Sequence, residues 1–275
     1  MDPAIPLEVR YMKQRQPIKT VYYTDERNDE FSTGGITPRI IDGDYTYVDP
    51  SRRWRFLRFL TYRLIAMPAG FLYCKAYHRA AFRNRRLLKQ VRGQGFFVYG
   101  NHTQQGADPF LPTLTLFPRS VYIIVHPDNV SMPVLGKVTP YLGALPLPSD
   151  RKAMLNFREA IRTRVRQGNV VMVYPEAHIW PYCTWIRDFP PTSMKFPVEL
   201  DAPSFAMTTT YHCRRFSKRP RTVTWLDGPF YPNPELPPRA RAKALRDQIY
   251  EAMVARSRES NQEYIRYEKK KENSQ

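Results

Sequence analysis

Short apolar runs alternate with amphipathic segments over residues 90–260. Five runs are rich in β-branched or aromatic residues and bounded by Gly, Pro or Asn, as strands are: 95–100, 120–126, 169–175, 204–212 and 221–228. Between the second and third runs, segment 151–168 has apolar residues at helical spacing, and Gly168 fits a C-terminal stop. This order predicts an α/β fold with a mixed, partly parallel sheet flanked by helices.

The two ends of the chain have a different pattern. Residues 1–50 are polar with scattered aromatic side chains and show no clear period, which predicts an arm that is disordered or laid over the body. Near the other end, Leu245, Ile249 and Met253 recur at four-residue spacing, which predicts a docked amphipathic helix. A charged, frayed tail is expected over 261–275. The chain is therefore expected to have four parts: 1–50, 51–89, 90–260 and 261–275.

The segment at 51–89 is basic and amphipathic. Apolar residues that begin at Phe56 recur at helical spacing, while Arg52, Arg55 and Arg58 fall on a separate stripe. Pro68 interrupts the pattern together with a nearby glycine, which predicts two helical pieces joined by a kink.

The apolar stretches of this segment are too short for a membrane span. The longest uninterrupted run has 11 residues, whereas a spanning helix needs about 20. Helices with aromatic residues on one side and arginines on the other suit the membrane interface, where each basic residue near an anionic surface contributes about 1 kcal/mol. The pattern favours amphipathic membrane-contact helices, and a core helix with a solvated arginine face is the alternative.

Charge narrows the choice of partner. The 275 residues are 42% hydrophobic and carry a formal net charge of +18, from 43 basic and 25 acidic side chains. Residues 1–50 hold 6 basic and 9 acidic ones, so the remaining 37 and 16 give the body +21. Such a body attracts a polyanion, which is a nucleic acid, an anionic membrane surface or a phosphorylated substrate.

The cysteines and the first residues indicate the compartment. Cys74, Cys183 and Cys213 are far apart and odd in number, which argues for a reducing compartment and against a disulfide framework. The first ten residues have no apolar stretch of the kind that a secretory signal has. We expect the protein to face the cytoplasm.

Candidate chemistry lies where the first strand ends. His102 follows the run at 95–100, and open α/β sheets bind ligands at the carboxyl ends of their strands. Asp108 and Pro109 have the pattern of an N-cap and a first helical residue. A carboxylate beside an imidazole also makes a general base. On these residues alone, a structural turn and a catalytic pair both remain open.

Two further strand-end signals follow in the sequence. Gly143 with Arg151 comes next, and then Pro175-Glu176. In this order, the three signals over residues 90–210 resemble the glycerolipid acyltransferase family, which includes 1-acylglycerol-3-phosphate acyltransferases and other lysophospholipid acyltransferases. That family has Asn-His, four residues and Asp-Pro, then Gly with a downstream Arg, then Phe-Pro-Glu-Gly-Thr-Arg. Its fourth motif is an apolar step containing Pro, which resembles Ala202-Pro203.

The resemblance implies a glycerol-3-phosphate acyltransferase-like fold and acyl transfer from acyl-CoA or acyl carrier protein to the free hydroxyl of a lysophospholipid. The expected acceptor is 1-acylglycerol-3-phosphate, which gives phosphatidic acid. His102 would act as the base and Asp108 would orient it. Arg151 would hold the acceptor phosphate, Glu176 (with Pro175 of its motif) would shape the acceptor site, and Gly143 would allow close backbone approach. No cofactor and no metal are implied.

The sequence departs from the family pattern in two places. Five residues separate His102 from Asp108 where the family has four, and Gly106 is the residue expected to absorb the extra one. The third motif reads Tyr-Pro-Glu-Ala-His-Ile and lacks the family Arg. Arg187 is a candidate substitute, with a solvated surface arginine as the alternative.

Two other classes of function stay open at this stage. A metal-dependent hydrolase would use four ligands: His102, Asp108, Glu176 and His178. A non-enzymatic nucleic-acid binder would use the basic body, although its basic residues lie beside apolar helices rather than in a nucleic-acid motif. We expect an enzyme of phospholipid synthesis, peripheral or monotopic on the cytoplasmic face of the cell membrane, with no nucleic-acid partner.

Overall fold

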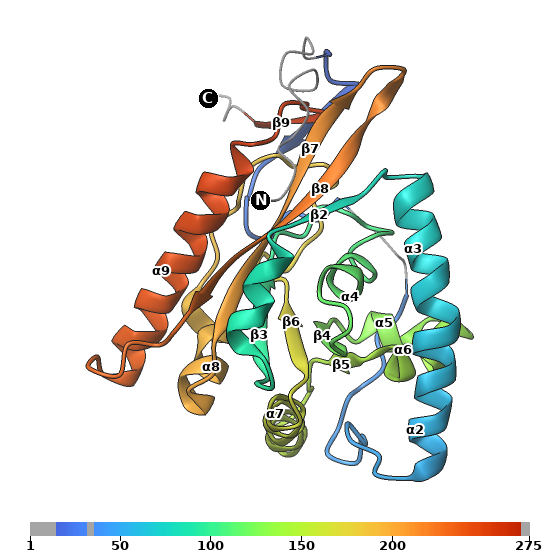
Figure 1. Cartoon of the computed structure of the whole chain (residues 1–275), viewed down its shortest axis with the longest axis vertical. Helices are drawn as coiled ribbons and strands as arrows, with labels where there is room; N and C mark the ends of the chain where they lie inside the picture. The colour runs from blue at the N-terminus through green and yellow to red at the C-terminus, as the bar shows by residue number, and fades with distance from the viewer. Residues whose placement is uncertain (1–14, 32–35, 271–275) are drawn as a thin grey trace, which may run out of the picture.

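The computed structural model describes residues 15–31 and 36–270. In this part of the chain, seven strands form one sheet in the order β2-β8-β7-β3-β6-β4-β5, and all neighbours are parallel except the antiparallel pair β7 and β8 (Figure 1). The strands are β2 (Ala81–Arg83), β3 (Phe96–Gly100), β4 (Val121–Val125), β5 (Ala144–Pro146), β6 (Val170–Val173), β7 (Ser204–Arg214) and β8 (Ser217–Phe230). The predicted α/β fold with a mixed sheet is confirmed, and β2 brings the end of segment 51–89 into that sheet.

Helices surround the sheet on both faces. They are α2 (Arg52–Arg58), η1 (Phe59–Ala66), α3 (Met67–Ala76), η2 (Arg85–Val91), α4 (Leu111–Thr115), α5 (Asp128–Ser131), α6 (Leu135–Leu142), α7 (Arg151–Arg166), η3 (Pro191–Met194), α8 (Lys195–Leu200) and α9 (Pro238–Ser257). The predicted helices at 151–168 and around Leu245 are α7 and α9. Gly168 has a φ of +75°, as expected for a residue that ends a helix in the left-handed region.

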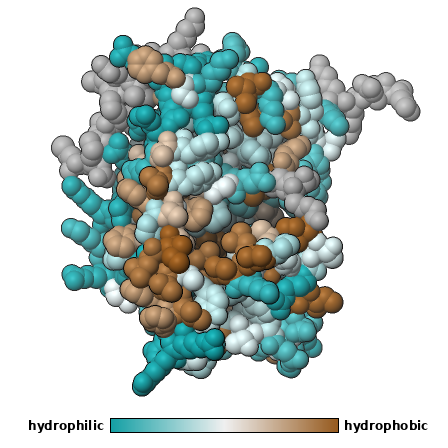
Figure 2. All heavy atoms as spheres, turned by 90° about the vertical axis from the view of Figure 1, so that its right-hand side faces the viewer, coloured by the Kyte–Doolittle hydropathy of each residue, from teal (hydrophilic) through white to brown (hydrophobic). Residues whose placement is uncertain are grey.

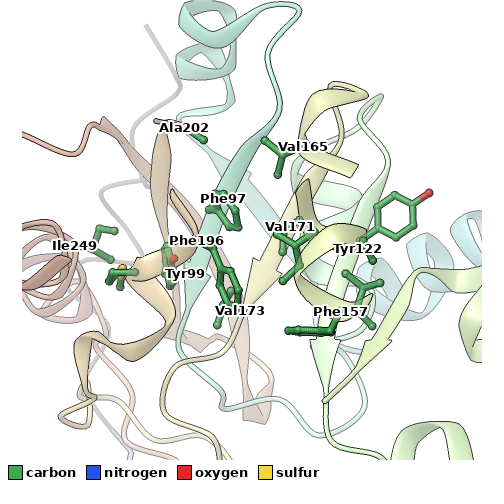
Figure 3. Packing of buried hydrophobic residues seen from close by; sticks show 14 of the residues in the cluster. Phe97, Tyr99, Tyr122, Phe157, Val165, Val171, Val173, Phe196, Ala202 and Ile249 are labelled. Carbon is green, nitrogen blue, oxygen red and sulfur yellow. The ribbon is translucent and has the colours of Figure 1, made fainter. Parts of the chain in front are cut away.

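The central strands are buried on both sides. Along β3, Phe97 and Tyr99 pack into the cluster that α7, α8 and α9 cover (Figure 3), whereas Phe96 and Val98 belong to a second cluster on the other face. β6 alternates in the same way. Strands covered on both faces read as continuous apolar runs, which is why the sequence marks them so clearly.

The helical segment that precedes the sheet is continuous from Arg52 to Ala76 (Figure 1). The prediction of two separate helical pieces is wrong, because the helix runs through Pro68 without a break. Ahead of the proline the helix is a π-helix, in which the Met67 amide donates to the Tyr62 carbonyl. This change of hydrogen-bond register accommodates a residue that has no N–H to donate, so the helix continues as α3.

The two ends of the described chain pair with each other. β1 (Lys19–Tyr23) runs parallel to β9 (Ile265–Lys269), so the described part of the arm lies over the body and part of the expected tail is a strand. The rest of the arm, at 1–14 and 32–35, and residues 271–275 lie outside the described residues. Neither strand was predicted, because each depends on a partner more than 200 residues away.

Trp180 anchors this two-stranded sheet to the body. Its side chain is fully buried, with ring centroids 4.9 Å from Tyr23, 5.1 Å from Phe31 and 4.9 Å from Tyr267, and its Nε1 donates to the Asp29 carbonyl at 2.8 Å. Aromatic contacts of this kind add to the free energy gained by burial.

We predict that Trp180→Ala lowers the free energy of unfolding by about 3–5 kcal/mol, because it opens a cavity between the arm and the body. Chemical denaturation of the purified chain measures this. Phe216→Ala is the matched control, since that ring is 90% exposed and should change stability by no more than about 0.5 kcal/mol. Equal effects of the two substitutions would contradict the anchoring role.

Candidate active site

Adjacent parallel strands bring the two predicted motifs together. β3 pairs with β6 in a register that sets Tyr99 beside Val173, so both strands end at the same edge of the sheet. A hydrogen bond joins the segments that follow the two strands, because the His102 amide donates to Glu176 Oε2 at 3.1 Å. On the other side of β3, the Asn101 side chain pairs with both main-chain groups of Thr209, at 3.0 and 2.8 Å.

The imidazole of His102 is held on two sides. Its Nδ1 lies 2.7 Å from Asp108 Oδ2, and its ring stacks on Tyr174 with a centroid distance of 4.3 Å and an angle of 17°. Asp108 Oδ2 also accepts the Gln104 amide at 2.9 Å, so the carboxylate is an acceptor and Nδ1 carries the hydrogen. None of the described residues forms a hydrogen bond with Nε2. The lone pair on Nε2 is therefore free to accept a proton.

The loop between His102 and Asp108 accommodates the extra residue. Turns close it, with the Asp108 amide donating to the Gln104 carbonyl at 2.9 Å. Gly106 does not adopt a positive φ; a Cβ there would lie 2.7 Å from Tyr73 Oη, so glycine permits a close approach instead. The five-residue spacing thus keeps the pair in hydrogen-bond contact.

Asp108 is not the helix cap that its sequence context suggests. α4 begins later, at Leu111, with Phe110 in the N-cap position, and no side chain caps it. The Asp108 carboxylate instead turns back to His102. Burial raises the pKa of Asp108, and the hydrogen bonds from His102 and the Gln104 amide partly offset this rise. The Tyr174 hydroxyl donates to the Asp108 carbonyl at 2.7 Å and fixes the main chain.

Glu176 is part of a buried ion pair. Its Oε1 accepts the Arg187 amide at 3.1 Å, and Oε2 lies 3.0 Å from Arg187 Nη2. Burial raises the pKa of Glu176, and the Arg187 guanidinium opposes that rise. Arg187 is only 1% exposed, also donates to the His178 carbonyl, and lies over the Trp180 ring at 4.8 Å. The reading of Arg187 as a solvated surface residue is wrong, since Glu176 holds it in the interior.

The remaining predicted site residues, Gly143, Arg151 and Pro175, form no hydrogen bond or ion pair with His102 within the described chain. Gly143 ends α6 with a φ of +98° and directly precedes β5, and a Cβ there would lie 2.4 Å from the carbonyl oxygen of Val121, the first residue of the neighbouring strand β4. That point is the amino edge of the sheet, whereas His102 lies at the carboxyl edge. Arg151 is the first residue of α7 and is exposed, and no hydrogen bond or ion pair within the described chain links it to the His–Asp pair. Pro175 is half-buried beside Glu176.

The proposed metal ligands are committed to other partners. Both oxygens of Glu176 accept hydrogen bonds, and His178 Nδ1 lies 3.6 Å from Glu30 Oε2 rather than beside His102. Over residues 15–31 and 36–270, no group of three or more His, Cys, Asp or Glu side chains is arranged to hold a metal ion. The geometry gives the hydrolase alternative no support.

Sequence reasoning missed the tyrosines and arginines around the loop. Tyr174 stacks on His102, and Tyr73 lies against Gly106 and stacks on Tyr77 at 5.5 Å. The Arg219 guanidinium lies over Tyr77 at 3.7 Å, and Arg214 donates to the Tyr77 carbonyl at 3.3 Å. Tyr174 directly precedes the Pro-Glu motif, but nothing local to these residues indicates their contacts.

Known proteins resemble the chain in sequence and in fold. Residues 79–208 match a family model described as Acyltransferase. The fold is similar to the crystal structure of the 1-acyl-sn-glycerophosphate (LPA) acyltransferase, PlsC, from Thermotoga maritima, with a TM-score of 0.50 and 14% identity over 75% of this chain and 88% of that chain. A search of curated protein sequences finds no match. The matched region contains His102, Asp108 and Glu176.

We predict that Arg187→Met lowers the free energy of unfolding by about 3–5 kcal/mol, because it leaves the Glu176 charge buried without its partner. Adding Glu176→Gln should recover part of the loss. Arg158→Met is the control, since its ion pair with Glu199 is partly exposed and should be worth about 1 kcal/mol or less. Urea denaturation of the parent, Arg187→Met, Glu176→Gln, the double variant and Arg158→Met tests this, and additive losses in the double variant would contradict the ion pair.

Proposed function

We propose that this chain is an acyltransferase like those of the family whose model matches residues 79–208, and that it acylates the free hydroxyl of a lysophospholipid. The acyl donor is a thioester of CoA or acyl carrier protein, and the acceptor is 1-acylglycerol-3-phosphate, which becomes phosphatidic acid. The observation that carries the proposal is the 2.7 Å contact between His102 Nδ1 and Asp108, which leaves Nε2 free.

The chemistry needs one proton transfer in each direction. His102 Nε2 takes the proton of the acceptor hydroxyl while its oxygen attacks the thioester carbonyl. The tetrahedral oxyanion collapses, the C–S bond breaks, and the thiolate leaves with the proton from the imidazolium. Asp108 orients the ring and stabilises the imidazolium between the two steps. No covalent acyl-enzyme and no cofactor take part, so the protein contributes positioning and proton transfer.

A phosphate-bearing substrate suits the charge near the loop. Arg214 and Arg219 contact Tyr77, which stacks on Tyr73 beside Gly106. Contacts through Tyr77 and Tyr73 connect these arginines to the loop that follows His102. Among the described residues, no such contacts connect Arg151 to that loop. We therefore propose them, ahead of Arg151, as the groups that attract the substrate phosphate, because a guanidinium suits phosphate geometry.

The protein works at a membrane surface on this proposal. Seven apolar side chains of the continuous α2–η1–α3 helix are exposed and together form what we call the apolar helix face: Phe56, Phe59, Leu60, Leu64, Ile65, Phe71 and Leu72. Figure 2 shows hydrophobic side chains gathered on this side of the molecule. α6 packs against η1 and adds the exposed Val134 and Leu135 at its start. A patch of this kind marks a surface that binds a protein or a membrane.

The basic residues at the two ends of the helix favour a membrane, rather than a protein, as the partner of the apolar helix face. Arg52, Arg53 and Arg55 are exposed at one end of the helix, and Lys75 and Arg79 at the other. Basic side chains that flank an apolar face are typical of helices that lie in an anionic interface. In the described chain, no helix is both long enough and apolar enough to cross a membrane.

We predict that His102→Ala and Asp108→Asn each reduce acyl transfer by about a hundredfold or more, because general-base assistance is lost or misdirected. The measurement is transfer from labelled acyl-CoA and acyl carrier protein to a panel of lysolipids with and without a phosphate monoester. Arg162→Gln, on the exposed side of α7, is the control and should retain parent activity. Transfer that is indifferent to His102 would overturn the proposed base, and no transfer to any acceptor would overturn the reaction.

We predict that Leu64→Gln combined with Leu72→Gln weakens binding to anionic vesicles by about tenfold or more, because buried leucines contribute about 1.5–3 kcal/mol each. Both side chains are exposed, at 55% and 68%, so thermal stability should not change. Vesicle co-sedimentation measures the binding. Phe216→Gln, on the turn between β7 and β8, is the matched control, and an equal effect there would argue against a defined membrane face.

A further inference from the structure

A cavity of about 540 Å³ lies under the start of the α2–η1–α3 helix. Its walls come from α2 and η1, from Ser120 and Tyr122 at the start of β4, and from Arg164 and Gln167 at the end of α7. These residues mark the amino edge of the sheet. His102 follows the carboxyl end of β3, so the cavity is separate from the candidate active site.

Two buried arginines line this cavity. Arg58 is 8% exposed and Arg164 is 5% exposed, and their guanidinium carbons lie 4.2 and 4.5 Å from the centroid of the Tyr122 ring. Arg58 Nη1 donates to the Tyr141 carbonyl at 2.9 Å. Arg164 donates to Gln167 Oε1 at 3.2 Å and to the Tyr47 carbonyl at 3.4 Å. Every hydrogen-bond acceptor that they have is neutral.

Neither charge is compensated. Within the described residues, Arg58 and Arg164 form no ion pair, and the buried atoms Arg58 Nη2 and Arg164 Nε lack a hydrogen-bond partner. The acidic residue on the cavity wall, Asp49, accepts the Ser51 amide at 2.8 Å. Burial lowers the pKa of both arginines, as expected where no carboxylate offsets desolvation. Two unpaired buried charges of one sign are costly in a free protein.

We infer that the cavity bounded by Arg58, Arg164 and Tyr122 binds a phosphate group, presented by an anionic lipid of the membrane on which the helix lies. The guanidinium groups of Arg58 and Arg164, which line the cavity, supply charge-assisted donors, and Ser120 and Gln167 add neutral polar groups. The lipid source follows from position, because the cavity wall includes Phe59, a member of the apolar helix face. Arg55 on the same wall is exposed, so its charge is available to the headgroups of an anionic membrane.

The stability of the free protein distinguishes an anion site from a purely structural role of the two arginines. If they served only to stack on Tyr122, Arg58→Gln would lower the melting temperature of the free protein. If they form an anion site, Arg58→Gln and Arg164→Gln remove an uncompensated charge, so the melting temperature of the free protein stays level or rises. Arg58→Lys keeps the positive charge but lacks the planar guanidinium and its paired donors. This variant tests the inference if a glutamine variant does not fold.

The first arm of the experiment uses inorganic phosphate and the full chain. We expect the melting temperature of the parent to rise with the logarithm of phosphate concentration, relative to chloride at equal ionic strength. Arg58→Gln and Arg164→Gln should lose this rise, and Arg58→Lys should keep only part of it. Arg166→Gln is the matched control on α7, because it is exposed and does not line the cavity. A parent that does not respond to phosphate, with a destabilised Arg58→Gln, would overturn the inference.

The second arm separates a lipid phosphate from a free one. Vesicles of phosphatidylcholine are compared with vesicles that also contain phosphatidic acid. Arg58→Gln should weaken the preference for phosphatidic acid by about tenfold or more, as loss of a charge-assisted hydrogen bond implies. Arg166→Gln should weaken it by about fivefold or less, as loss of one surface charge implies. Equal losses would overturn the lipid assignment, and a phosphate response without any such preference would assign the cavity to the soluble ion.

Discussion

The Glu176 carboxylate holds together the three segments on which the candidate site depends. It accepts the His102 amide beyond β3, it lies beyond β6 itself, and it binds both the amide and the guanidinium of Arg187. In the protein interior these charge-assisted bonds are strong, and loss of any one leaves a desolvated group unsatisfied. The position of the imidazole is thus set through the main chain, with Asn101 and Thr209 fixing β3 against β7 on the other side. Asp108 and Tyr174 then need only to orient the ring.

Much of this arrangement could be predicted from the sequence, because it is encoded locally. β3 and β6 are apolar runs bounded by turn residues, and parallel pairing brings their carboxyl ends to one edge. His102 and Glu176 were therefore expected at the same edge of the sheet, and the observed neighbourhood of β3 and β6 brings them into contact. The contact with Asp108 was less certain, since the five-residue loop works only because turns at Gln104 and the small Gly106 let the chain fold back.

Most of the errors and omissions have one physical cause, which is dependence on tertiary contacts that the local pattern does not show. Asp108 has the local pattern of a helix cap, and only the position of His102 turns its carboxylate away from α4. Arg187 has nothing beside it in sequence that marks burial, yet Glu176 compensates its charge. The strands β1 and β9 each lack an alternating pattern, and their pairing depends on the other strand and on Trp180. Local periodicity cannot encode any of these contacts.

The α2–η1–α3 helix has the opposite amphipathicity from a helix that folds onto a protein core. Its buried residues include Arg58 and Tyr62, while Phe56 and Leu72 are exposed. In water both features are unfavourable, since apolar surface is hydrated and a guanidinium is desolvated without a counter-charge. The proposed membrane interface would resolve both at once, because the apolar helix face would leave water and lipid phosphate would become available to the arginines beneath it. Departures from local rules that occur together on one element, and that binding to one surface would relieve, are expected where an element functions in binding.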